Sequence, residues 1–161
     1  MSQGGKKLKL LIIQLSDLHF ENTKQTHSIS IDKMIYAIKS RQTADECVIV
    51  ISGDLAAKGR NVDYNYVKGF ISALLRSLNG AGYKDKKIYV LSVPGNHDVN
   101  FSGLSVTIND IIESYQNGTV NNLKEMYIDS MQGYFLYAVE QGCFIDDKVI
   151  SKKIIEYGNK K

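Results

Sequence analysis

Several features that would place a protein in a common class are missing from this sequence. No apolar stretch approaches the length of a membrane-spanning helix, and the apolar segment Leu10–Ile13 is too short for the core of a signal peptide. The two cysteines, Cys47 and Cys143, match no spacing typical of a zinc site or a disulfide framework. We therefore expect a cytoplasmic protein without a membrane partner, in which Cys47 is a small buried apolar side chain.

A strong net charge is also missing. The 161 residues carry a formal net charge of +3, and the lysines are scattered rather than gathered in one band. A nucleic-acid-binding surface needs a basic face, so the composition does not favour nucleic acid as a partner, although it leaves that partner open. The sequence contains neither the Gly-x-x-x-x-Gly-Lys-Ser/Thr segment of P-loop ATPases nor the Gly-x-Ser-x-Gly turn of serine hydrolases.

Short apolar runs alternate with helical patterns up to residue 100. The runs, which we predict to be buried strands, are Leu8–Leu15, Cys47–Ile51 and Ile88–Val93. Apolar side chains recur at helical spacing between them, first at Ile31, Met34, Ile35 and Ile38 and then at Tyr66, Phe70, Leu74 and Leu78. Ser28 or Ser30 can cap the first helix, and Asn79-Gly80 is a plausible end for the second.

This order of elements predicts an α/β fold. Right-handed crossovers would place the strands in a parallel β-α-β-α-β core at residues 1–100. Helical spacing continues after residue 100, first at Ile108, Ile111, Ile112 and Tyr115, and then in a longer stretch from Leu123 to Ala138. We predict that residues 101–161 form a mainly helical extension or insertion.

Each predicted strand ends in a short polar loop that contains residue types common among metal ligands. The loops are Ser16–His19, Ser52–Leu55 and Pro94–Asp98. In open parallel sheets, ligands bind at the carboxyl ends of the strands. We therefore expect the three loops to converge on one crevice and to form the functional site there.

The side chains in these loops suit a pair of divalent cations. Asp17 and His19 stand two positions apart, so both can reach the same ion, and the two carboxylate oxygens of Asp54 can bridge two ions. Asn96 offers a neutral amide oxygen, which binds a metal without adding negative charge. Mixed oxygen and imidazole ligands suit Mn, Fe or Zn better than Mg or Ca. The predicted metal ligands are therefore Asp17, His19, Asp54 and Asn96.

His97 need not bind a metal. Beside Asn96 it can face a phosphate, stabilise developing charge or protonate a leaving group, and Asp98 can hold its imidazole in one tautomer. We therefore expect His97 and Asp98 to be catalytic. Gly53 and Gly95 let the backbone turn sharply beside these residues.

Together, the three loops resemble the first three motifs of the calcineurin-like metallophosphoesterases, in the segments Asp17-x-His19, Gly53-Asp54 and Gly95-Asn96-His97-Asp98. The resemblance implies the first half of a four-layer sandwich, in which helices enclose two sheets. It also implies hydrolysis of a phosphomonoester or phosphodiester at a dinuclear metal centre. The first two motifs look most like the branch that contains cyclic-nucleotide phosphodiesterases.

The same resemblance implies a role for each site residue. Asp17 and His19 would bind the first metal, and Asp54 would bridge the two metals. Asn96 would bind the second metal. His97 would contact the phosphate, with Asp98 supporting it. The sequence departs from the family pattern at Ala57, where many members have Asp or Asn.

Members of that family complete the site with histidines from later motifs, but the histidines of this chain are only His19, His27 and His97. We expect His27 to be an exposed loop residue. Two explanations stay open: a fragment of a longer enzyme, or a naturally short protein with a weakened site. We favour the fragment, because the trio of Asn96, His97 and Asp98 is intact. Such a fragment would bind one ion tightly or none, and would be inactive or weakly active alone.

A fragment would also leave one apolar face of the sheet without its partner sheet. Self-association could cover that face, so we expect a homo-oligomer. Three functions compete: a phosphate-ester hydrolase, a catalytically silent metal-binding or interaction module, and a nuclease of the same superfamily. We expect the hydrolase, with a phosphate ester as its substrate.

Overall fold

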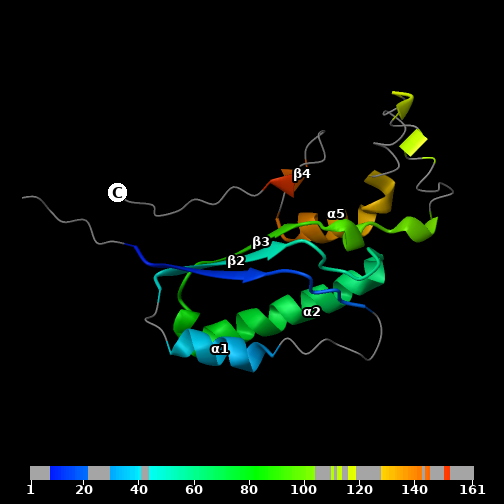
Figure 1. Ribbon diagram of the computed structural model, residues 1–161. Coiled ribbons are helices and arrows are strands. Elements are labelled where there is room, and N and C mark those ends of the chain that lie inside the picture. Colours follow the sequence, from blue (N-terminus) through cyan, green and yellow to red (C-terminus); the bar gives the residue numbers. More distant parts are fainter. Residues whose placement is uncertain are drawn as a thin grey trace, which may run out of the picture.

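The computed structural model describes residues 8–21, 30–40, 44–103, 110, 112–113, 116–118, 128–142, 144–145 and 151–152. Its centre is a parallel sheet of three strands in the order β1-β2-β3 (Figure 1). The strands are β1 (Leu10–Leu15), β2 (Glu46–Ser52) and β3 (Ile88–Val93), close to the predicted ranges. Because Leu15 pairs with Ile51 and Ile51 pairs with Ser92, the carboxyl ends of all three strands lie side by side at one end of the sheet. The predicted parallel α/β fold is confirmed.

Helix α1 (Ile31–Lys39) begins as the sequence predicts. The Ser30 side chain accepts a hydrogen bond from the backbone N–H of Lys33 at 3.2 Å, whereas Ser28 lies outside the described residues. Its sheet-facing side carries the predicted apolar set of Ile31, Met34, Ile35 and Ile38. Together with α2 (Asn61–Leu78), it lies on one side of the sheet (Figure 1).

Helix α2 buries a different stripe from the predicted one. Leu74 and Leu78 are fully buried as expected, but Tyr66 is exposed, and Val67 and Ile71 are buried instead. An α-helix has about 3.6 residues per turn, so a stripe drawn at intervals of four drifts around it. Phe70 is partly buried against the core, so the predicted stripe is right from Phe70 to Leu78 and wrong at Tyr66.

The left-handed turn after α2 comes later than Asn79-Gly80. The α-helix ends at Leu78, but a π-helical segment, Asn79–Tyr83, continues it. The left-handed residue is Gly82, with a φ of 97°. Gly82 therefore has the role that the sequence analysis gave to Gly80, because glycine adopts this conformation without a Cβ clash.

The two faces of the sheet differ in exposure. On the face that α1 and α2 cover, the buried side chains include Ile49 and Cys47, and burial raises the pKa of the Cys47 thiol to about 11. On the opposite face Leu10, Ile12 and Val93 are exposed, Ile12 by 61%. The prediction that β1 is buried on both faces is wrong, because β1 is an edge strand covered by helices on one face. The expected apolar patch and its self-association stay predictions.

Beyond residue 103 the structure describes only part of the chain. Helix α5 (Gln132–Glu140) buries Tyr134 and Ala138 of the predicted helical stretch, and Tyr137 as well. Strands β4 (Phe144–Ile145) and β5 (Ser151–Lys152) pair antiparallel, which the sequence analysis did not predict. Apart from Ile112, the predicted helical face at 108–115 lies outside the described residues, as do His27, Cys143 and the start of the second stretch.

The division of the chain at residue 100 stays a prediction. Helix α5 does not stand apart from the earlier elements, since the Tyr134 hydroxyl donates to the carbonyl oxygen of Ser92 in β3 at 2.8 Å. In the described part of the chain, no helix combines the length and the apolar character that a membrane span requires.

Ile49 and Ile12 offer a matched test of the two faces. Ile49→Ala removes a fully buried side chain and should lower the free energy of unfolding by about 2–5 kcal/mol. Ile12→Ala acts on the exposed face and should change it by about 0.5 kcal/mol or less. Urea unfolding followed by circular dichroism measures both values, and equal losses would contradict the assignment of the faces.

Candidate metal centre

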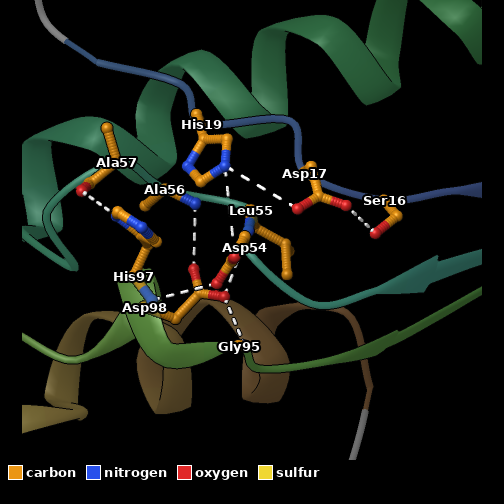
Figure 2. Close-up of polar contacts among 10 residues, drawn as sticks. All are labelled: Ser16, Asp17, His19, Asp54, Leu55, Ala56, Ala57, Gly95, His97 and Asp98. Atoms are coloured by element: carbon orange, nitrogen blue, oxygen red, sulfur yellow. Dashed lines mark hydrogen bonds and ion pairs between the residues drawn. The ribbon is translucent and has the colours of Figure 1, made fainter.

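The three loops that follow the strands lie against one another, as the sequence predicts. The backbone N–H groups of His19 and Phe20 donate to the carbonyls of Asp54 and Leu55, both at 3.0 Å, so the first loop runs beside the second. The third loop turns into a short 3-10 helix, η2 (Asn96–Asp98). The polar side chains of the three loops gather between the strand ends (Figure 2).

Three of the predicted ligands have a backbone conformation that is rare outside glycine. Among the residues that the structure describes, Asp17, His19 and Asp54 are the non-glycine residues with positive φ, at 55°, 46° and 52°. A left-handed residue with a Cβ costs about 1–2 kcal/mol and persists only where its surroundings fix it, which is common at functional sites. The loops are therefore shaped to aim these three side chains.

His19, Asp54 and His97 form a cluster in which one potential ligand atom from each lies within 4.8 Å of the others. The Nε2 atom of His19 lies 3.9 Å from Asp17 Oδ1 and 4.0 Å from Asp54 Oδ2 (Figure 2). Metal–ligand bonds of about 2 Å place two ligands of one ion up to about 4 Å apart. Imidazole and carboxylate donors at these separations fit a divalent transition metal.

The predicted ligands differ in how closely they join this cluster. Asp17 lies at its edge, with a side chain that is 70% exposed and that accepts a hydrogen bond from the Ser16 hydroxyl. Asn96 is exposed at the start of η2, where it lines a cavity together with His97. His97, predicted to contact phosphate, lies close enough to His19 and Asp54 to be a metal ligand as well. The assignment of roles stays a prediction.

Asp54 is fixed in place by the third loop. Its Oδ1 accepts a hydrogen bond from the backbone N–H of His97 at 2.9 Å. A Cβ atom on Gly95 would lie 2.0 Å from the same oxygen, so any side chain there would collide with the carboxylate. Gly95 has a φ of −109°, which other residues adopt. Glycine is therefore required at position 95 by this close approach, and not by the sharp turn that the sequence indicates.

The carboxylate of Asp98 binds groups other than the His97 imidazole, which the sequence analysis expected it to hold. This carboxylate is fully buried and accepts hydrogen bonds from the backbone N–H groups of Leu55 at 3.0 Å, Ala56 at 2.9 Å and Gly95 at 2.8 Å. The Tyr64 hydroxyl donates to the same carboxylate at 2.8 Å. Asp98 thus joins the second loop to the third loop and to helix α2.

The imidazole of His97 is oriented by a backbone carbonyl instead. Its Nδ1 lies 3.1 Å from the carbonyl oxygen of Ala57 (Figure 2). A carbonyl only accepts, so Nδ1 carries the proton in this contact and Nε2 is left to face a ligand. Ala57, whose side chain cannot form hydrogen bonds, thus contributes to the site through its main chain.

Two contributors to the site were not predicted from the sequence. Tyr64 is buried in α2 and stacks on Tyr137 of α5, with ring centroids 5.6 Å apart. Burial, together with the negative charge of Asp98, raises the pKa of Tyr64, so its hydroxyl remains a donor. In the sequence, Tyr64 looks like any other buried residue of a helix, so its role at the site could not be predicted. The second contributor, the Ala57 carbonyl, has no side-chain signal at all.

A comparison with known protein families agrees with this geometry. A family model described as calcineurin-like phosphoesterase matches residues 10–159. The chain therefore belongs to the calcineurin-like phosphoesterase family. The match reaches well beyond the three loops that carry the resemblance in the sequence.

Two curated proteins are similar to a little over half of this chain. An uncharacterized metallophosphoesterase-like protein of Bacillus subtilis is 30% identical over 94 residues, which is 58% of this chain and 18% of the relative. A probable cyclic nucleotide phosphodiesterase of Fibrobacter succinogenes is 32% identical over 95 residues, which is 58% of this chain and 32% of the relative. The chain thus corresponds to a third or less of the relatives' length.

Gly95→Ala tests the close approach to Asp54. The added methyl group should displace the Asp54 carboxylate and weaken manganese binding by at least about tenfold, as for other losses of ligand support. Gly69→Ala is the matched control, because a Cβ on Gly69 in α2 meets no atom within 4 Å. Isothermal titration calorimetry measures both affinities, and unchanged binding by Gly95→Ala would contradict this geometry.

Tyr64→Phe tests the hydrogen bond to Asp98. The buried carboxylate loses one donor, and the free energy of unfolding should fall by about 1.5–3 kcal/mol, as for a hydrogen bond to a charged group. Tyr36→Phe, on the exposed side of α1, should change it by about 0.5 kcal/mol or less. Chemical unfolding of the two variants measures the difference. Equal stabilities would show that Tyr64 does not support the site.

Proposed function

We propose that this chain supplies the first part of a metal-dependent phosphoesterase site, which hydrolyses a phosphomonoester or phosphodiester at two divalent ions. The observation that carries the proposal is the cluster of His19, Asp54 and His97 at the carboxyl edge of the sheet, in a chain that belongs to the calcineurin-like phosphoesterase family. When bound, the ions would polarise a phosphoryl oxygen and lower the pKa of a water molecule. Manganese, iron and zinc suit these donors.

Each predicted site residue has a role in this proposal. Asp17 and His19 would hold one ion, Asn96 would hold the other, and Asp54 would be shared between them. With Nδ1–H directed at the Ala57 carbonyl, Nε2 is the ring nitrogen that faces the phosphate, and in the imidazolium form of His97 it would donate to the phosphate or the departing oxygen. Asp98 acts through position: it holds the loops that carry Asp54 and His97.

Similarity to a probable cyclic nucleotide phosphodiesterase favours a phosphodiester over a phosphomonoester. A catalytically silent metal-binding or interaction module is the second candidate. It is favoured by one observation, that no histidine follows His97 in the sequence. Manganese stoichiometry of the 161-residue chain tests whether the site is complete here. One tightly bound ion or none is expected if ligands from elsewhere in a longer protein complete the site, and two tightly bound ions would mean that this chain holds a full centre. The hydrolysis experiment below separates the enzyme from the silent module.

Hydrolysis of bis(4-nitrophenyl) phosphate with manganese, by the protein of the full reading frame, tests the activity. Asp54→Asn should lose both the bound metal and the activity. His97→Gln should retain metal but react about 100- to 10,000-fold more slowly, because general acid–base or phosphate contact is lost. Metal content is measured by mass spectrometry.

Asp85→Asn serves as the matched control. Asp85 is exposed in the turn before β3, at the opposite end of the sheet, so metal content and rate should match the unmodified protein. If unmodified protein binds manganese but hydrolyses no phosphate ester, the silent module is correct. If His97→Gln loses the metal, His97 is a ligand and its assigned role is wrong.

A further inference from the structure

A cavity of about 390 Å³ lies directly beside the candidate metal centre. Its lining residues include Asn96 and His97 on the side of the metal cluster, Ala57 and Lys58 from the second loop, and Phe101 and Ser102 from the segment after η2. A cavity of about 150 Å³ already holds benzene, so this one has room for a ring and the atoms that link it to a phosphate. If the substrate's phosphate lies at His97, the group that is esterified to this phosphate and extends towards Phe101 occupies the cavity.

Phe101 lines this space and is the one aromatic residue besides His97 among its described lining residues. It begins a short 3-10 helix, η3 (Phe101–Gly103), and its side chain is 52% exposed. The neighbouring backbone is anchored, because the Asn100 N–H donates to the carbonyl of Ser130 at 2.7 Å and the Asn100 side chain accepts from the Ser102 N–H at 3.1 Å. Within the described residues, no other ring stacks on Phe101.

The charges beside the cavity are already paired. Lys58 forms an ion pair with Glu21. Arg60 donates to both carboxylate oxygens of buried Asp63, at 3.0 and 2.8 Å, and lies 3.6 Å from Glu21. Two cations and two carboxylates leave no excess positive charge to hold a second phosphate. The cavity therefore suits an uncharged group better than a polyphosphate.

We propose that this cavity receives a planar ring carried by the esterifying group of the substrate, with Phe101 as the residue that selects for it. Base–aromatic and aryl–aryl stacking both fit this surface, so the class comprises nucleoside and aryl phosphate esters. The inference rests on the proposed function, because it requires the phosphate to lie at His97. It adds to that function a specificity-determining residue and the chemical class of the group beyond the phosphate.

Binding of three phosphonates that cannot be hydrolysed as esters tests the inference in the full-length protein with manganese. Phenylphosphonate carries a planar ring, cyclohexylphosphonate a non-planar ring of similar size, and methylphosphonate no ring. Isothermal titration calorimetry should show phenylphosphonate binding about tenfold more tightly than either of the others, as expected for one stacking contact. Phe101→Ala should reduce this preference to about twofold or less, and Phe101→Tyr should retain it.

Tyr36→Ala is the matched control, since Tyr36 is an exposed aromatic residue on α1 and does not line the cavity. It should leave the preference unchanged. Equal binding of the three phosphonates, or a preference that survives Phe101→Ala, would overturn the ring inference and leave the proposed function standing. If the unmodified protein binds manganese but no phosphonate at all, the phosphate site itself is wrong and both proposals fail.

Discussion

The buried carboxylate of Asp98 is the interaction on which the arrangement of the site depends. A buried carboxylate without partners is strongly destabilising, and here three backbone N–H groups and one phenol hydroxyl offset that cost. The donors come from the loops after β2 and β3 and from helix α2. Because all of them point at one side chain, neither loop can move away without leaving a charge unsatisfied.

The positions of the candidate ligands follow from this constraint. Asp54 directly precedes Leu55, which donates to Asp98, and His97 directly precedes Asp98 itself. The hydrogen bond from His19 to the Asp54 carbonyl then attaches the first loop to the second. The left-handed conformations of Asp17, His19 and Asp54 cost free energy locally, and these connections hold them in place.

Much of the fold and the convergence of the loops were predictable because they depend on local patterns. An apolar run followed at once by Asp, His or Asn places those residues at a strand end, and parallel strands bring their ends together. The predictions of burial failed where burial depends on which elements pack against one another. Tyr66 is exposed because the geometry of packing on the sheet, and not its own apolarity, selects the stripe of α2. One face of β1 is exposed because α1 and α2 cover only the other face, and an apolar run does not indicate how many of its faces are covered.

The class of fold, the three loops and the residue types that they present could all be inferred from the order of residues, because they depend on periodicity and on the order of elements along the chain. The contacts of each residue became known from the folded chain. The fold gave His97 the Ala57 carbonyl as a partner and gave Asp98 the backbone of two loops. It also placed Tyr64 beneath the site. The physical reason is that main-chain donors and acceptors are the same at every position, so their pairing leaves no signal in the identities of the side chains.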